Sequence, residues 1–256
     1  MKNVLVLLHD DEGQEARLQV ALDLARALSG HLMLLDAIVP PAVVSDYISV
    51  AGGAMMMECE RERERHNRSL VAARMEREDV PWSMIEKVGA AGRELRNASD
   101  LADVIVVSLP TAETAGQFRH IVGDIAVRSS RPVLAVPAGC RGFDVTGHAL
   151  VCWNASHEAS EALGEAIPLL QHAGSVTVLD VDHPAEEFSV DEAAAYLSRH
   201  GSHAEIVKRQ SAGNPISDII LNEAHATAAA YLVIGAYGTP RAIEFLFGGV
   251  TAGLLR

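Results

Sequence analysis

The chain has 256 residues, of which 49% are apolar, and this is enough for one large domain or two of ordinary size. No apolar run reaches the roughly 18 residues of a membrane span, and an acidic segment follows the first apolar run in place of the cleavage site of an export signal. A net charge of -13 disfavours nonspecific binding to nucleic acid or to an anionic membrane.

Short apolar runs alternate with longer mixed segments through the first half of the chain. Continuous runs of Val, Ile and Leu, separated by helical crossovers, are typical of a parallel sheet that is covered on both faces. The pattern therefore predicts a doubly wound α/β domain with five strands. The predicted strands are 3–10, 31–39, 82–88, 103–110 and 131–137, and the helices between them are 14–30, 56–78, 92–101 and 116–130.

The same pattern starts again after residue 147. The two halves superpose at an offset of about 144 residues, which places Gly30 on Gly174 and Asp10 near Asn154. Self-similarity on this scale indicates an internal repeat of one domain. The second set comprises strands at 148–156 (with a turn), 175–183, 203–210 and 229–236, and helices at 158–174, 190–201, 214–228 and 242–255.

The boundary between the two copies is predicted at 137–147, which contains Pro and several Gly. We therefore expect two domains, 1–140 and 146–256. Nothing like 131–137 follows residue 255, so the second copy is predicted to lack its last strand. Because exposed sheet edges need covering, we expect an intrachain pseudo-dimer that pairs again into a homodimer.

Four glycines follow the last predicted strand: Gly235, Gly238 and the pair Gly248-Gly249. Ligands of open parallel sheets bind where the strand order reverses, and we expect the first and fourth strands to flank that point. Glycine lets backbone amides approach a ligand, and free amides near a helix start attract anions. Since lysine is scarce, a phosphate chain must be held by amides, a few arginines or a metal. No Walker A sequence is present.

The segment GAYGTPRAIEFLFGGVT resembles the G-x2-G-x9-G-[ST] nucleotide motif of the universal stress protein family. Gly235, Gly238 and Gly248 stand at the matching positions, whereas Gly249 replaces the usual Ser or Thr and so removes a hydroxyl but keeps an amide. The repeat resembles the tandem members of that family, whose domains have the adenine-nucleotide α-hydrolase-like fold.

The resemblance implies that the second domain binds ATP, ADP or AMP, with the presence of Mg²⁺ left open. It also implies a role in survival under stress. Because no residue is identified as a catalyst, we expect this role to be exerted by binding and not by turnover. In the family, the residue after the first strand and a main-chain group at the end of the second contact the ribose and adenine. The implied ligand contacts are Asn154, Val181, Ile234, Gly235, Gly238, Gly248, Gly249, Val250 and Thr251.

The first half departs from this motif. Ser108 and Thr111 stand where the second half has its first two glycines, and eleven residues separate Thr111 from Gly123. Asp124 places a carboxylate near the expected phosphate path, where it repels phosphate, and Pro110 removes an amide donor. We therefore expect no nucleotide, or a different ligand, in the first half.

Two other classes of function stay open. A nucleotide-free scaffold would use the glycines for a tight turn and close helix packing, and Asn154 as a cap or Asx turn. A slow ATP hydrolase needs a nucleophile, a base and an orienting group in one place. Ser156 and His157 adjoin the expected pocket, but no motif joins them, so no residue is assigned to catalysis.

Three further segments have an interpretation from their residue types. The acidic residues of 180–183 indicate a solvated loop in preference to a cation site, so no metal ligands are predicted. The alternating charges of 58–68 indicate a solvated helix face. The methionine-rich segment 48–59 is either an adaptable lid or surface for an unidentified protein partner, or a loop that leads into a helix whose methionines face the core. Three cysteines without ligand spacing fit a reducing cytoplasm.

Overall fold

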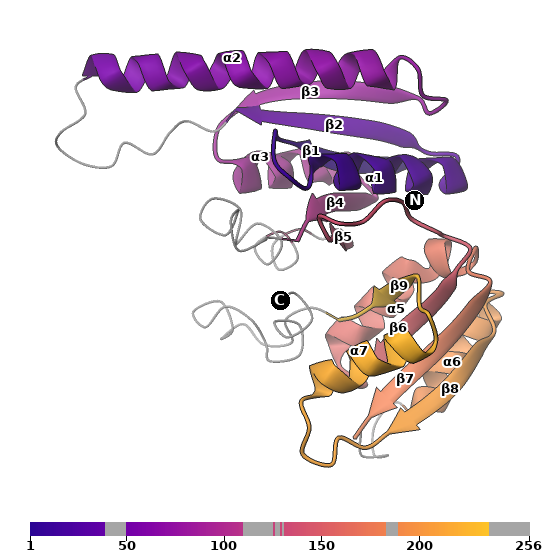
Figure 1. Ribbon diagram of the computed structural model, residues 1–256. Helices are drawn as coiled ribbons and strands as arrows, with labels where there is room; N and C mark the ends of the chain where they lie inside the picture. Colours follow the sequence, from indigo (N-terminus) through magenta and orange to yellow (C-terminus); the bar gives the residue numbers. More distant parts are fainter. Residues whose placement is uncertain (39–49, 110–124, 126–128, 130, 183–188, 236–256) are drawn as a thin grey trace. The chain divides into compact units, whose positions relative to one another are not determined.

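The computed structural model describes residues 1–38, 50–109, 125, 129, 131–182 and 189–235. The chain divides into two compact units, residues 1–143 and 144–256 (Figure 1). Among the residues that the structure describes, no helix combines the length and the apolar character needed to cross a membrane.

The first unit contains a parallel sheet of five strands in the order β3-β2-β1-β4-β5, as the apolar runs predict. The order therefore reverses between β1 and β4. The strands are β1 (Asn3–Leu8), β2 (His31–Ile38), β3 (Trp82–Val88), β4 (Val104–Ser108) and β5 (Val133–Val136).

Helices α1 (Gln14–Leu28), α2 (Val50–Met75) and α3 (Ala91–Ala98) join the strands of the first unit, and the 3₁₀ turn η1 (Ser99–Leu101) follows α3. Helix α1 packs on β1 and β4, and α2 lies along β2 (Figure 1). The predicted helix 116–130 falls almost wholly outside the described residues, although Ile125 is helical.

The methionine-rich segment is not the loop that one interpretation expected. Residues 50–59 belong to α2, so the helix begins before the predicted residue 56. Met55 is 72% exposed and does not face the core.

The second unit contains four parallel strands in the order β8-β7-β6-β9. Four strands among the described residues agree with the prediction that the second copy lacks the fifth. The predicted helix 242–255 lies outside the described residues. The strands are β6 (His148–Trp153), β7 (Ser175–Val181), β8 (Ala204–Arg209) and β9 (Tyr231–Val233), and the helices are α5 (His157–Leu170), α6 (Val190–Arg199) and α7 (Ile216–Ala226).

The central strands are buried on both faces, which is why they are apolar without alternation. Val4, Leu5 and Val6 of β1 have no exposed surface, and Leu150 of β6 is buried to the same extent. The edge strands β3 and β8 contain a mixture of exposed and half-buried positions, because one side of an edge strand meets solvent. Each unit therefore has its own core, centred on its first strand.

The same close approach of backbone occurs in both units where the first helix returns to the sheet. A Cβ on Gly30 would lie 2.7 Å from the carbonyl oxygen of Lys2, and a Cβ on Gly174 would lie 2.6 Å from that of Thr146. Gly30 and Lys2 are as far apart along the chain as Gly174 and Thr146 are, so the same packing requirement accounts for glycine at both positions. This is structural support for an internal repeat.

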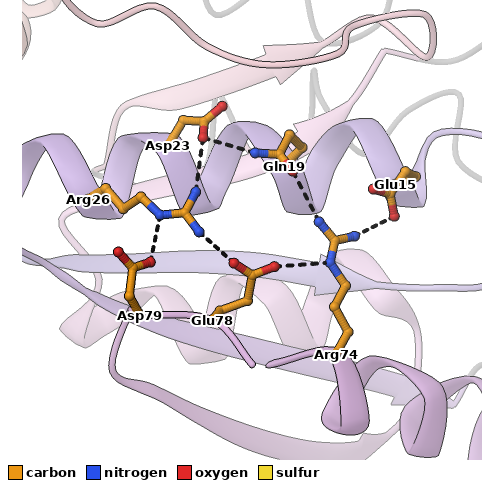
Figure 2. A network of polar contacts seen from close by, with 7 residues as sticks. All are labelled: Glu15, Gln19, Asp23, Arg26, Arg74, Glu78 and Asp79. Atoms are coloured by element: carbon orange, nitrogen blue, oxygen red, sulfur yellow. Dashed lines mark hydrogen bonds and ion pairs between the residues drawn. The ribbon is translucent and has the colours of Figure 1, made fainter. Parts of the chain in front are cut away.

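A polar network joins α1 to the end of α2 on the surface of the first unit (Figure 2). Arg26 of α1 contacts Asp23, Glu78 and Asp79, and Arg74 of α2 contacts Glu15, Gln19 and the same Glu78. Glu78 is therefore the carboxylate that both arginines share. The network connects α1 to the end of α2.

Candidate functional site

The strand order of the second unit reverses beside β6. Val151 of β6 is in register with Val233 of β9, and β7 lies on the other side of β6. Since all these strands are parallel, the loops after β6 and β9 begin at the same edge of the sheet. Open parallel sheets bind ligands at such a reversal.

Asn154, the first residue after β6, forms an Asx turn. Its Oδ1 accepts a hydrogen bond from the backbone N–H of Ser156 at 3.2 Å, and Ala155 between them has a φ of 53°. Ser156 is the N-cap of α5, because its Oγ accepts from the N–H of Ala159 at 3.2 Å. Asn154 is exposed, and this turn uses its side-chain oxygen but not its NH₂ group. The Asx turn that was the alternative interpretation of Asn154 is therefore present.

Gly235 lies directly against the first turn of α5. A Cβ at this position would be 2.6 Å from the amide nitrogen of Ala159 and 2.7 Å from the carbonyl carbon of Glu158. Such distances leave no room for any side chain, because the neighbouring atoms are backbone. The missing side chain thus brings the loop after β9 to the positive end of a helix.

The described part of the predicted site consists of Asn154, Val181, Ile234 and Gly235. Asn154 and Gly235 flank the start of α5, Ile234 precedes Gly235, and Val181 ends the neighbouring strand β7. The remaining predicted residues, Gly238, Gly248, Gly249, Val250 and Thr251, lie outside the described residues.

The acidic end of β7 is bonded to the loop after β8. Asp182 has a φ of 56°, and its Oδ1 accepts a hydrogen bond from the N–H of Ser211 at 3.0 Å. The side-chain and backbone hydrogen bonds of Ser211 hold the pKa of Asp182 below its usual range. Nowhere in the described part of the chain do three or more His, Cys, Asp or Glu side chains form a group that could hold a metal ion.

The two cations at the carboxyl end of β8 already face carboxylates. Arg209 makes a bidentate contact with Glu223, at 2.8 and 3.0 Å, and Lys208 lies 3.8 Å from Asp191. We therefore expect backbone amides, and not these side-chain charges, to bind an anion at this edge.

The side chains considered for catalysis have structural roles or point to other partners. Ser156 caps α5, and His157 faces Glu161 one turn along the helix at 3.1 Å, with both side chains exposed. Burial raises the pKa of the Cys152 thiol to about 12, and Cys152 packs on the apolar cluster around Leu150. It is therefore not a reactive thiolate at neutral pH.

In the first unit the corresponding reversal, between β1 and β4, is filled by Arg17. This side chain is fully buried, and its guanidinium donates to the carbonyl oxygens of Leu7 and His9, to both oxygens of Asp11 and to Oγ of Ser108. A Cβ on Gly13 would collide with the Ser108 side chain. The end of β1, its loop and the end of β4 are thus joined by one arginine.

Helix α2 covers the neighbouring ends of β1 and β2. Nδ1 of His9 lies 2.8 Å from Oε1 of Glu64, and Gln14 and Asn67 exchange two amide hydrogen bonds of 2.7 and 2.8 Å. Arg68 lies 3.4 Å from Asp36. The prediction that 58–68 is a solvated face is therefore wrong at Glu64 and Asn67, which are buried. These positions continue the buried helical stripe of Val71 and Met75 toward the N-terminus, and that spacing was the available signal.

The sequence matches no protein-family model and no curated protein. A universal stress protein structure from Archaeoglobus fulgidus DSM 4304 matches 99% of this chain and 92% of its own, with 15% identity and a TM-score of 0.74. UspA from Lactobacillus plantarum covers 53% of this chain and 97% of its own, with 11% identity and a TM-score of 0.46. A universal stress protein in complex with cAMP covers 53% and 96%, with 21% identity and a TM-score of 0.34. The first match shows that this chain has the fold of a universal stress protein, as the glycine motif and the repeat imply.

Proposed function

We propose that this chain, whose fold is that of the universal stress proteins, is a tandem member of that family and binds an adenine nucleotide at the carboxyl edge of its second sheet. The observation that carries this proposal is the position of Gly235. It is the first glycine of the motif, it follows β9 at the strand-order reversal, and its backbone lies against the first turn of α5.

In this proposal backbone amides hold the phosphates. The expected donors belong to the motif that continues through Gly238, Gly248 and Gly249 to Val250 and Thr251. Amide donors suit this edge because the cations Lys208 and Arg209 already face Asp191 and Glu223. Asn154 contacts the ribose through its NH₂ group, and the main chain at Val181 and Ile234 contacts the base and the sugar.

The proposal assigns one nucleotide to each chain. In the first unit, Arg17 fills the reversal, and Glu64, Asn67 and Arg68 of α2 cover the adjacent strand ends. The expectation that the first unit binds no nucleotide was based on Pro110 and Asp124, which lie outside the described residues. The buried arginine is a separate physical reason for the same expectation.

The proposed role is binding without turnover, since the described Ser156 and His157 have other partners. A ligand that binds one conformation better shifts the population toward it, and the phosphate state then controls docking of a protein partner. A homodimer stays a prediction from the exposed sheet edges, and a cytoplasmic location stays a prediction from the sparse cysteines.

A nucleotide-free scaffold is the second candidate. Two observations favour it: the Asx turn gives Asn154 a local role, and close helix packing alone accounts for Gly235. An experiment must therefore separate packing from ligand binding.

The test begins with the purified full chain, extracted with acid and examined by chromatography for released adenine nucleotide. Titration calorimetry with ATP, ADP and AMP then gives the affinity and the number bound. Gly238→Asp is the matched variant, because a carboxylate on the phosphate path repels the ligand. Binding that is lost in this variant supports the proposal, and unchanged affinity overturns the site. No binding at all favours the scaffold, and steady phosphate release favours a hydrolase.

A further inference from the structure

A buried charged cluster joins α2 to the first sheet, and we call it the anchor cluster: His9, Asp36, Glu64 and Arg68. His9 follows β1, Asp36 lies on β2, and the other two residues lie one turn apart on α2. His9 is 5% exposed, and Asp36 and Glu64 are each 1% exposed. Few carboxylates are buried to this degree without full pairing.

The two carboxylates of the cluster differ in their partners. Among the described residues, no hydrogen bond reaches the buried Oδ1 of Asp36. Glu64 keeps its ion-pair contact with His9 at 2.8 Å, and Arg63 lies 3.6 Å away. Among the described residues, the ion-pair contact of Asp36 is the longer one of 3.4 Å between its Oδ2 and Arg68.

Arg68 itself is shared with a third carboxylate. Asp36 is in register with Glu86 on β3, and Arg68 contacts Glu86 more closely than it contacts Asp36. Glu86 is half exposed, so its charge is solvated, whereas that of Asp36 is not. Asp36 is therefore the least compensated charge of the group.

The pKa directions agree with this geometry. Burial first, and then the negative charge of Glu64, raise the pKa of Asp36 above its usual range, against the opposing effects of Arg68 and His9. For Glu64, burial also acts to raise the pKa, but His9, Arg63 and Asn67 outweigh it and the net direction is downward. The pKa values of the two carboxyl groups are thus shifted in opposite directions, and Asp36 is the group that accepts a proton first as the pH falls.

We propose that Asp36 is a proton-binding site that fastens α2 to the first sheet as the pH falls. A proton is the ligand that the geometry favours, because Asp36 is buried near the negative charge of Glu64 and shares Arg68 with Glu86. Protonation removes the repulsion between Asp36 and Glu64, leaves the contact between Glu64 and His9 in place, and gives the buried carboxyl an O–H donor. The first unit thereby acquires a response to pH that is separate from the nucleotide proposed for the second unit.

The sign of the effect follows from linkage. A group with a raised pKa binds its proton more tightly in the folded state, so stability increases as the pH falls through the raised value toward the ordinary one. Glu64, with a lowered pKa, loses its contribution only at still lower pH. Each pKa unit by which Asp36 is raised corresponds to roughly tenfold in the folding equilibrium.

The test uses hydrogen exchange of the full chain at pH 7.5 and 5.5, corrected for intrinsic rates. We expect protection of the backbone amides in 64–75 to be higher at the lower pH, and Asp36→Asn to abolish that difference. Asp100→Asn, which changes an exposed carboxylate of the same unit, keeps the wild-type response.

A titration of the Asp36 carboxyl carbon by NMR in the unaltered chain gives the result even if the variant does not fold. A midpoint above the ordinary aspartate range supports the proposal. A midpoint at or below that range, or protection in 64–75 that falls at pH 5.5, overturns it.

Discussion

The backbone of Gly235 lies so close to Ala159 that a Cβ at position 235 would be 2.6 Å from the Ala159 amide nitrogen. This relationship joins the loop after β9 to the first turn of α5, at the point where the order of the second sheet reverses. It is one packing contact, and the proposed nucleotide site depends on it.

Gly235→Ala is expected to destabilise the second unit by about 1–3 kcal/mol, because backbone atoms must move to admit the methyl group. The same movement displaces the loop from α5, so nucleotide affinity falls as well. Urea unfolding and ATP titration measure the two effects. Gly139→Ala is the control, since nothing lies within 4 Å of its added Cβ. Wild-type stability in Gly235→Ala would contradict the close contact.

Substitution of Asn154 separates its turn from its proposed ligand contact. Asn154→Asp keeps the oxygen that accepts from Ser156, so the fold is retained and ATP affinity stays within about threefold, since a carboxylate also bonds hydroxyls well. Asn154→Ala loses about 1 kcal/mol from the turn and binds ATP roughly tenfold more weakly. If Asn154→Ala lost stability but kept full affinity, the residue would belong to the turn alone.

Arg17→Met is expected to destabilise the first unit by about 3–5 kcal/mol, because it leaves Asp11 and two carbonyl oxygens without their buried partner. Arg17→Lys does not restore this stability, since an ammonium lacks the planar fork that reaches all of these acceptors. Arg93→Met, at an exposed ion pair, changes stability by no more than about 0.5 kcal/mol. Urea unfolding of the three variants is the measurement, and equal stability of the two methionine variants would rule out the buried role.

Glu78→Gln removes the carboxylate that Arg26 and Arg74 share (Figure 2). We expect a loss of about 1 kcal/mol at low salt, since the pairs are partly exposed. The loss shrinks in roughly 1 M salt, where screening acts over a few ångströms. Thermal unfolding at both salt concentrations, with the exposed Glu76→Gln as control, checks the effect. A loss that does not depend on salt would show that packing, and not charge, holds this corner.

Much of the fold could be predicted from the sequence because its signals are local. Unbroken apolar runs gave the positions of the strands, and glycines at 30 and 174 marked the repeated return of the helix to the sheet. The expected neighbours of β1 and β6 at the reversals are also those observed. These features depend on the periodicity of apolar residues and on glycine at close backbone contacts, and both can be read from a short stretch of sequence.

The partners of Arg17 and Glu64 could not be predicted in the same way, because they are far away in the sequence. Ser108, at the end of β4, accepts a hydrogen bond from Arg17 of α1, and His9, after β1, contacts Glu64 in the helix that connects β2 to β3. Local patterns place a charged residue on a solvated face by default. Only the fold brings the compensating groups together and makes burial of these charges tolerable.

Photo-crosslinking of the full chain with 8-azido-ATP, followed by mapping of the labelled peptides, tests the central claim most directly. The account predicts label that excess ATP suppresses and that lies within residues 144–256. Label within residues 1–143, or the absence of any label that ATP suppresses, would contradict it.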